Sequence, residues 1–331
     1  MKHQFGIIGF GRMAEVCHKP LIESLPNVQL SAVYDPTPAR RQEAEKQGYR
    51  VYDKLSAFLK HPDLEAVAVV TPSVTHHDVV IKALQADKHV IVEKPMAMNA
   101  KEAYAMIQTA KKQQKILTVF HNRRYDADYL TVKKIVQSGK LGKILAIESR
   151  IQGWGSAAGF GIPTFYQNWR NEKKWGGGGL YDWGSHLIDQ MQMMVKSPVE
   201  SVTANLQKGN FAKDCDDYAI GMIRFQNGIN GLIEVNYMTK YPLPRWRVIA
   251  ENGTLINEVS NWNEITYFDP SGNLEMHIPV EKGDPKVIYQ SFLKAIQGKG
   301  KPVVAPDSVL KTMQIIDAFF ASSKKGSSIQ F

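Results

Sequence analysis

The sequence predicts an α/β fold in two parts. A doubly wound parallel sheet comes first, and an α+β domain with a large, mostly antiparallel open sheet follows it. Apolar segments alternate with helical segments up to about residue 122, as in a parallel sheet with crossover helices. From residue 143, strand-like segments follow one another with Asn-Gly and Ser-Gly turns between them, as in hairpins. The 331 residues exceed the ~250–300 at which one core stops growing. The predicted domains are 1–122 and 123–331.

The composition limits the classes of partner. The formal net charge is +9, but the lysines are spread over many segments without a basic stripe interleaved with aromatics, so nucleic acid is not expected. No apolar run approaches the ~18 residues of a membrane span, and the amino terminus lacks the apolar region of a signal peptide. Cys17 and Cys215 have no metal-ligand spacing and suit a reducing compartment, so a cytoplasmic protein is expected.

A glycine motif follows the first strand, residues 4–8. Residues 9–14 are Gly-Phe-Gly-Arg-Met-Ala, the G-x-G-x-x-A form of the dinucleotide fingerprint. The first glycine allows a tight turn, the second lets the backbone approach a pyrophosphate, and the small third residue lets the helix at 12–24 pack closely. The first N–H groups of that helix face the phosphates. We therefore expect a Rossmann domain whose cofactor contacts include Gly9, Phe10, Gly11, Arg12 and Met13.

Asp35 ends the second strand, residues 28–34, about 20 residues beyond the glycines. A carboxylate there binds the adenosine ribose hydroxyls and repels the additional phosphate of NADP, which favours NAD. Arg40 and Arg41 follow closely; they either offset that repulsion, which leaves NADP as the alternative, or are surface charges of the next helix. Asp35-Pro36 is also a common start of a turn, which is the structural alternative for Asp35.

The alternation continues with predicted helices and strands in turn. Helices are expected at 38–47, 55–60, 75–86 and 100–114, and strands at 64–71, 90–93 and 116–120. The strand at 90–93 ends in Glu93-Lys94-Pro95 because proline cannot donate to a sheet ladder. Ligands of open parallel sheets bind outside the carboxyl ends of strands, so Lys94 is placed where chemistry is expected. The structural alternative is a charged pair that only starts a loop.

Four motifs occur in order along the chain: Gly9-x-Gly11-x-x-Ala14, Thr71-Pro72-Ser73-Val74-Thr75-His76, Glu93-Lys94-Pro95 and Asn122-Arg123-Arg124-Tyr125. Together they resemble the successive motifs of the Gfo/Idh/MocA family, which comprises glucose–fructose oxidoreductase and inositol dehydrogenase-like oxidoreductases. The resemblance extends over nearly the whole chain.

The resemblance implies roles that the residues alone do not. It places Thr71, Pro72 and His76 on the nicotinamide-ribose side of the cofactor site, with Glu93 and Lys94 beside them, and it implies a cis peptide bond before Pro95. Ser73 stands where the family commonly has asparagine. Without the resemblance, Thr71-Pro72 is a strand end with a turn, and His76 is more typical of a surface residue.

The second half is expected to be α+β. After a helix at 126–138, strands are predicted at 143–152, 199–208, 217–225, 231–238, 245–251, 254–259, 264–269 and 274–280. An antiparallel sheet of this kind packs helices on one face and leaves the other for water or a partner. The resemblance implies that subunits pair through that open face, as a homodimer or homotetramer. A closing helix at 307–323 is expected to pack back on the first domain.

Residues 175–189 have the sequence Trp-Gly-Gly-Gly-Gly-Leu-Tyr-Asp-Trp-Gly-Ser-His-Leu-Ile-Asp. Glycines let the backbone pass close to a ligand. Asp182, His186 and Asp189 have the i, i+4, i+7 spacing of one helical face, on which a carboxylate can set the tautomer and basicity of a histidine. The structural alternative is a capped helix start with a hydrogen-bonded core histidine. The segment resembles the family motif whose catalytic aspartate and histidine correspond to Asp182 and His186, whereas Asp189 matches a structural position.

Two further interpretations concern ligands. Asp182, His186 and Asp189 are candidate metal ligands, but zinc usually takes more nitrogen or sulfur donors, so no metal is predicted. The segment 154–175 is rich in glycine and aromatic residues, which either line a sugar pocket or pack against one another. The candidate substrate contacts are Asn122, Arg124, Tyr166, Trp169 and Arg170.

These observations lead to one functional hypothesis and one alternative. The hypothesis is an NAD(P)-dependent oxidoreductase that moves a hydride between the cofactor and a hydroxyl or carbonyl carbon of a sugar or polyol, such as an inositol or an aldose. Lys94, Asp182 and His186 form the catalytic set. The alternative is a non-catalytic nucleotide sensor with the same fold.

Overall fold

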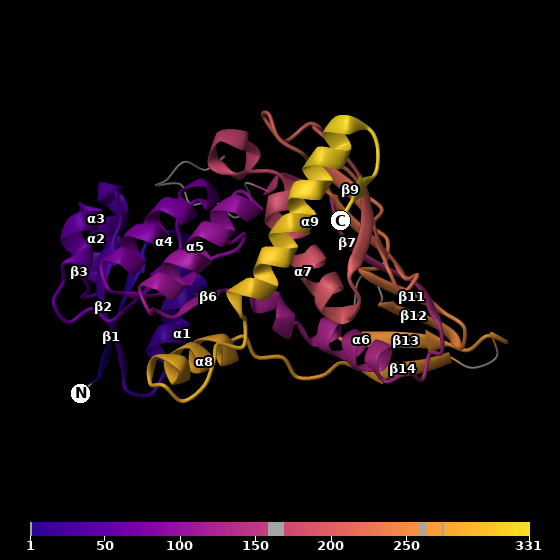
Figure 1. The fold of residues 1–331 in the computed structure, drawn as a ribbon, viewed down its shortest axis with the longest axis horizontal. Helices are drawn as coiled ribbons and strands as arrows, with labels where there is room; N and C mark the ends of the chain where they lie inside the picture. The colour runs from indigo at the N-terminus through magenta and orange to yellow at the C-terminus, as the bar shows by residue number, and fades with distance from the viewer. Residues whose placement is uncertain (1, 158–168, 258–261, 273–274) are drawn as a thin grey trace.

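The computed structural model describes residues 2–157, 169–257, 262–272 and 275–331 (Figure 1). The amino-terminal part contains a six-stranded sheet in the order β3-β2-β1-β4-β5-β6, in which each neighbouring pair is parallel. This is the strand order of the doubly wound dinucleotide-binding fold. The strands are β1 (His3–Ile8), β2 (Val28–Tyr34), β3 (Arg50–Tyr52), β4 (Ala66–Val69), β5 (His89–Val92) and β6 (Leu117–Val119).

Helices cover both faces of this sheet, which is why all four residues of β4 are buried apolar side chains. They are α1 (Lys19–Glu23), α2 (Pro38–Lys46), α3 (Leu55–Leu59), α4 (His76–Gln85) and α5 (Ala100–Lys112). The first predicted helix is divided, because a π turn, η1 (Ala14–His18), precedes α1. The strand β3 was not predicted, since three residues are too short to show a period.

The second sheet has nine strands in the order β14-β13-β12-β11-β7-β10-β9-β8-β15. Its pairs are antiparallel except for β10 against β7. The predicted α/β fold with a mostly antiparallel second sheet is therefore confirmed. The strands are β7 (Ile144–Gln152), β8 (Val199–Gln207), β9 (Tyr218–Phe225), β10 (Asn230–Asn236), β11 (Trp246–Ala250), β12 (Gly253–Asn257), β13 (Glu264–Phe268), β14 (Glu275–Pro279) and β15 (Ile329–Gln330).

Helices α6 (Ala127–Gln137), α7 (Ser185–Met194) and α9 (Pro306–Lys325) lie on one side of this sheet (Figure 1). The approach is close where α9 crosses β9, since a Cβ built on Gly221 would lie 2.3 Å from the Phe319 ring. Helix α9 also contacts the first part of the chain, where the Ala100 N–H donates to Asp317 at 2.9 Å. Helix α8 (Lys286–Ile296), which was not predicted, packs beside α1.

A buried ion pair ties α7 and α9 to the segment that leaves the first sheet. The Arg124 guanidinium donates to both carboxylate oxygens of Asp189 at 2.7 and 2.6 Å, and Thr312 of α9 donates to the same carboxylate at 3.0 Å. Asp189 has no exposed surface, and Arg124 is 8% exposed. The helix that carries His186 is therefore fixed by charge as well as by packing.

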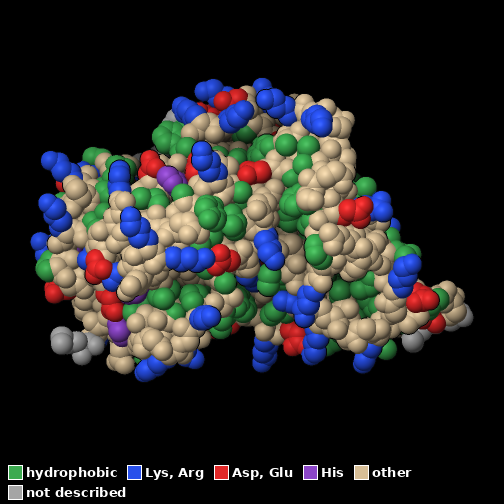
Figure 2. All heavy atoms as spheres, in the orientation of Figure 1, with side chains coloured by type: hydrophobic (Ala, Val, Ile, Leu, Met, Phe, Trp, Pro, Cys, Tyr) green, Lys and Arg blue, Asp and Glu red, His purple; other side chains and the backbone are tan. Residues whose placement is uncertain are grey.

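The surface shows no gathering of basic side chains on the face in Figure 2, where Lys and Arg are spread among other residues. In the part of the chain that the structure describes, no helix is both long and apolar enough to cross a membrane. Cys17 and Cys215 are free thiols.

Replacing Asp189 by alanine would leave the Arg124 charge buried without its carboxylate. We expect Asp189→Ala to lower the free energy of unfolding by roughly 3–5 kcal/mol, the usual cost of removing one partner of a buried pair. The matched control is Asp307→Ala, because the Asp307–Lys111 pair is 3.4 Å long and its side chains are 64% and 60% exposed. That change should cost less than about 1 kcal/mol. Urea denaturation measures both, and equal losses would contradict the assigned role of the Arg124–Asp189 pair.

Candidate active site

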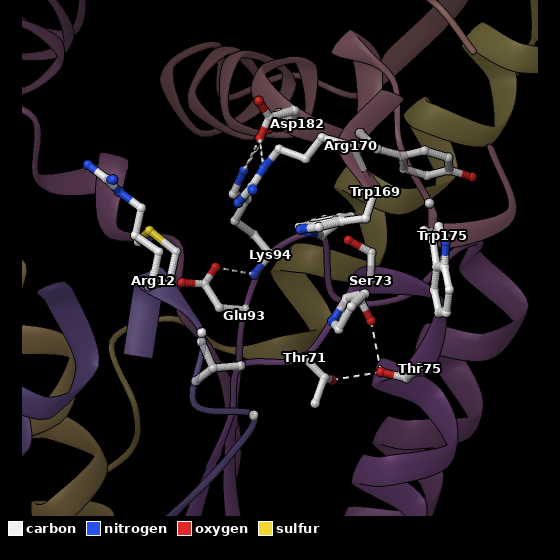
Figure 3. Close-up of a pocket in the computed structure, with 18 of the residues that line it drawn as sticks. Arg12, Thr71, Ser73, Thr75, Glu93, Lys94, Trp169, Arg170, Trp175 and Asp182 are labelled. Atoms are coloured by element: carbon white, nitrogen blue, oxygen red, sulfur yellow. Dashed lines mark hydrogen bonds and ion pairs between the residues drawn. The ribbon is translucent and has the colours of Figure 1, made fainter. Parts of the chain in front are cut away.

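A cavity of about 380 Å³ lies at the carboxyl ends of β1, β4 and β5 and extends to the start of α7 (Figure 3). Most of the predicted site residues line it: Gly9, Gly11, Arg12, Met13, Asp35, Arg40, Thr71, Pro72, Glu93, Lys94, Asn122, Trp169, Arg170, Asp182 and His186. Phe10, His76 and Arg124 are not among its lining residues. Tyr166 lies outside the described residues.

The glycine turn has the shape that a dinucleotide requires. Gly9 has φ +91°, and a Cβ there would lie 2.8 Å from the Val70 carbonyl oxygen, so only glycine fits. A Cβ on Gly11 would meet nothing within 4 Å, because Gly11 borders the cavity. This open space beside a backbone turn fits a pyrophosphate. The Phe10 ring is buried, and the Phe10 N–H donates to Asp35 at 2.7 Å.

Asp35 and Arg40 are held in place by hydrogen bonds. Asp35 accepts from the N–H groups of Phe10 and Thr37, the latter at 2.8 Å, and a carboxylate with about four lone-pair sites can still accept from ribose hydroxyls. Arg40 donates to the Phe10 carbonyl oxygen at 2.7 Å and pairs with Glu15. Arg40 therefore braces the glycine turn, in addition to bordering the cavity.

Lys94 reaches from the end of β5 to Asp182, which lies just before α7 (Figure 3). The Lys94–Pro95 peptide bond is cis. The Lys94 N–H donates to Glu93 at 2.9 Å, and its ammonium group donates to the Asp182 carbonyl oxygen at 2.9 Å and to the Asp182 carboxylate at 3.1 Å. An ammonium group has three donors. Among the described residues, two of these donors have partners, which leaves the third for a ligand in the cavity.

The Asp182 carboxylate has three polar partners among the described residues. Besides Lys94, the Tyr237 hydroxyl donates to its second carboxylate oxygen at 3.2 Å, and the Arg170 guanidinium lies 3.9 Å away. Burial opposes the charge of Asp182, but Lys94 and Arg170 outweigh it and hold the pKa below its ordinary value. Burial, followed by the Asp182 charge, raises the pKa of Tyr237 well above normal, so its hydroxyl keeps its proton.

His186 does not pair with Asp182, contrary to the expectation from their spacing. Asp182 lies in a π turn, η7 (Leu180–Gly184), whereas His186 lies in α7, so the regular i, i+4 relation is interrupted. Nδ1 of His186 is buried and has no hydrogen-bond partner among the described residues. The rings of Trp183 and His121 lie edge-on to the imidazole, at centroid distances of 5.7 and 5.9 Å.

The surroundings of His186 favour its neutral form. Burial is the main cause, and the charges of Lys94 and Arg123 add to it, so the pKa of His186 lies well below the ordinary value of 6.5. A neutral imidazole can accept a proton at neutral pH. The structure thus provides a proton acceptor that borders the same cavity as the Lys94 ammonium group.

Two predicted site residues lie behind the cavity. The His76 ring nitrogens are 2.8 Å from the Pro95 carbonyl oxygen and 2.9 Å from that of Thr71, and the side chain is buried rather than on the surface. Arg124 was predicted to contact substrate, but its guanidinium is occupied by Asp189 and lies outside the cavity lining. The local sequence contains no sign of this pairing, because the two residues are far apart in the chain.

Several cavity residues were not singled out from the sequence. Arg123 lies over the Trp183 ring at 3.8 Å, and Trp175 adds a third indole near Trp169. Tyr237, which follows β10, is not a lining residue but donates to the Asp182 carboxylate, and it was not singled out either. Arg123 belongs to a recognised motif and could have been chosen on that ground. Among the described residues, no group of three or more His, Cys, Asp or Glu side chains is placed to hold a metal ion.

Comparison with known proteins places this geometry in a family. A model described as an oxidoreductase family with an NAD-binding Rossmann fold matches residues 3–121, and the Gfo/Idh/MocA C-terminal domain matches residues 129–256. An NAD(P)-dependent oxidoreductase is the class that the fold and the site define. The chain belongs to the Gfo/Idh/MocA family, and the predicted cofactor class is confirmed.

Individual relatives span nearly the whole chain. The scyllo-inositol 2-dehydrogenase (NADP(+)) of Bacillus subtilis is 27% identical, with 97% of this chain and 93% of that protein covered. The D-glucoside 3-dehydrogenase of Escherichia coli is also 27% identical, over 98% and 96%. Among solved structures, an NAD-binding protein from Listeria innocua is 30% identical, with a TM-score of 0.89 and coverage of 100% and 97%. The WlbA dehydrogenase from Bordetella pertussis, in complex with NADH and UDP-GlcNAcA, is 25% identical, with a TM-score of 0.85 and coverage of 100% and 99%.

The two glycines of the turn should respond differently to substitution. Gly11→Val places a side chain in the cavity without a clash, so we expect the melting temperature of the ligand-free protein to stay unchanged and the stabilisation by NAD(H) to be lost. Gly9→Ala should instead lower the melting temperature of the ligand-free protein, because its Cβ meets the Val70 carbonyl oxygen. Thermal-shift measurements with and without NAD(H) test both. Full stabilisation of Gly11→Val by NAD(H) would contradict the assigned pyrophosphate position.

Proposed function

We propose that this enzyme transfers a hydride between NAD(P) and a hydroxyl or carbonyl carbon of a sugar or polyol, with Lys94, Asp182 and His186 as its catalytic set. The observation that carries the proposal is the convergence of these three side chains at one end of a cavity whose other end holds the glycine turn. The bound nicotinamide supplies the hydride acceptor in oxidation and the donor in reduction. The protein binds the substrate, orients it and moves the proton.

In oxidation, His186 accepts the proton of the reacting hydroxyl. Its low pKa keeps the imidazole neutral until it takes that proton. In reduction, the imidazolium returns the proton to the new alkoxide. Nδ1 of His186 is enclosed by the protein, so the exchange is assigned to the other ring nitrogen.

Lys94 stabilises the negative charge that develops on the reacting oxygen. Two of its ammonium donors are occupied by Asp182, and the third is assigned to the substrate. Asp182 holds the ammonium group in position, and the Tyr237 hydroxyl in turn holds the Asp182 carboxylate. Preorganised donors of this kind need no rearrangement when the charge appears.

A sugar or polyol fits the remaining walls of the cavity. Trp169, Trp175 and Trp183 provide ring faces, and the guanidinium groups of Arg123 and Arg170 lie over Trp183 and Trp169 at 3.8 and 4.3 Å. Aromatic faces pack against the C–H faces of sugars, and guanidinium groups donate to hydroxyl oxygens. Relatives named for scyllo-inositol, D-glucoside and 1,5-anhydro-D-fructose support this substrate class. Asn122, Trp169 and Arg170 are the proposed substrate contacts, and the non-catalytic alternative gains no support.

The domain roles and the assembly are part of the proposal. Residues 1–122 hold the dinucleotide, and residues 123–331 provide the substrate site and the subunit contacts. On the face of the second sheet away from α9, Met222 of β9 is 47% exposed and lies opposite Leu232 of β10. These apolar side chains support pairing of two copies through that face, as a homodimer or homotetramer. The two free thiols support a reducing, cytoplasmic location.

Replacing either reacting group should reduce turnover but not cofactor binding. We expect Lys94→Met to lower kcat about 10²–10³-fold and His186→Ala about 10²–10⁴-fold, with stabilisation by NAD(H) retained. Absorbance of the reduced nicotinamide, followed over a panel of inositols, aldoses and glucosides, gives the rates. Lys111→Met, at a surface lysine that is 60% exposed, is the control and should keep full activity. Undiminished turnover of Lys94→Met on a verified substrate would refute the assignment.

The pH dependence follows from the low pKa of His186. Oxidation requires the neutral imidazole, so kcat/KM should fall on the acid side only below pH 6.5. The fall reflects protonation of His186, and it should be absent from the residual rate of His186→Ala. Initial rates across a pH series in buffers of constant ionic strength measure the profile. An acid limb centred above pH 6.5 that depends on His186 would contradict the assigned environment.

A further inference from the structure

Glu93 is held from behind the cavity by a histidine that belongs to no recognised motif. Nε2 of His18 lies 2.8 Å from one carboxylate oxygen of Glu93, and Nδ1 of His18 lies 2.6 Å from the Tyr289 hydroxyl. His18 and Tyr289 have no exposed surface. The three side chains come from η1, from the end of β5 and from α8, which are distant in the sequence.

The direction of these hydrogen bonds follows from the charge of Glu93. Burial opposes ionisation of Glu93, but the hydrogen bond with His18 and the charge of Lys94 hold the pKa of the carboxyl group below its ordinary value. An ionised carboxylate only accepts hydrogen bonds, so Nε2 of His18 carries the hydrogen. The second carboxylate oxygen accepts the Lys94 N–H at 2.9 Å. Both oxygens are therefore fixed, and the backbone at Lys94 is tied to one of them.

Local packing leaves this arrangement little freedom. The Phe120 ring lies 4.5 Å from the His18 ring and 5.7 Å from the Tyr289 ring, measured between centroids. His18 is the last residue of the π turn and faces inward. A shift of one residue in a helix rotates a side chain by about 100°, so the register of the turn decides whether His18 meets Glu93.

We propose that His18 and Tyr289 are positioning residues of this enzyme: acting through Glu93, they fix the backbone from which Lys94 reaches Asp182 and the reacting oxygen. The inference rests on the proposed catalytic role of Lys94. It also gives α8 a functional role, because this helix from the second half of the chain completes the support of a residue in the first half. A merely structural role, in which three buried polar groups satisfy one another, would affect folding without acting through Lys94.

A double-mutant cycle separates these two roles. Tyr289→Phe removes only the hydroxyl, and we expect it to lower kcat about 10–100-fold, the scale of a small misplacement of a reacting group, with KM for NAD(H) unchanged. In the Lys94→Met background the same change should alter kcat less than about 2-fold, because the group being positioned is gone. A smaller folded fraction would instead lower kcat by the same factor in both backgrounds.

Each outcome of the cycle has a defined meaning. An equal factor in both backgrounds, or full kcat in Tyr289→Phe alone, overturns the positioning role and leaves the proposed function standing. Unchanged kcat in Lys94→Met alone overturns the proposed function, and this inference with it. Single-turnover measurement of nicotinamide absorbance reaches the low rates of the double variant.

Further variants test whether a loss of kcat comes only from a general destabilisation of α8 or η1. Ser291→Ala removes a buried hydroxyl of α8 that donates to Ile288 at 2.8 Å and accepts from Val303 at 3.1 Å, so it should lower the melting temperature and keep kcat. His18→Gln places an amide donor near the position of Nε2 and should retain more kcat than His18→Leu. Equal kcat for His18→Gln and His18→Leu, or loss of kcat in Ser291→Ala, would count against the inference.

Discussion

The site depends on the ion pair between Lys94 and Asp182, because it joins the two halves of the chain at the place where the reacting oxygen is expected. Each side chain is 17% exposed, and a charge that leaves water at such a site needs a partner. Asp182 is bound at the same time by Tyr237, from beyond β10, and lies 3.9 Å from Arg170. The Asp182 carboxylate is therefore the common partner of Lys94, Tyr237 and Arg170, which come from distant segments of the chain. The position of the Asp182 carboxylate therefore determines where Lys94 presents the ammonium donor that Asp182 does not bind.

The charges around this pair also give Lys94 and His186 different roles. The carboxylate holds Lys94 as a donor of hydrogen bonds, whereas burial and the neighbouring cations keep His186 neutral. The site thus presents a charged hydrogen-bond donor and a neutral proton acceptor to the same cavity. The Arg124–Asp189 pair contributes indirectly, since it fixes α7 through Asp189 and so determines where His186 meets the cavity.

The sequence predicts those parts of the molecule that depend on neighbours along the chain. The glycine turn, the strand that ends just before Glu93 and Lys94, the alternation of strands and helices in the first part and the hairpin strands of the second all follow from local patterns, and the structure contains them. The partners of Asp182, Asp189 and Glu93 do not follow, because Tyr237, Arg124 and His18 are brought to them only by the folded sheets. Helix α8 is a different case: its buried residues Ile288, Phe292 and Ala295 have helical spacing, so the helix itself could have been predicted from the local pattern. Only its role depends on the distant contact of Tyr289 with His18.

The two π turns explain the clearest difference between pattern and structure. Spacing rules assume 3.6 residues per turn, and both η1 and η7 depart from that value beside the cavity. In η7 the departure separates Asp182 from His186, so that Asp182 binds Lys94 while His186 faces the cavity without a carboxylate. A regular helix would have stacked the two side chains and paired them. The π turn therefore lets Asp182 and His186, four residues apart, serve different partners. The proposed site requires this separation, because the carboxylate must stay charged while the imidazole stays neutral.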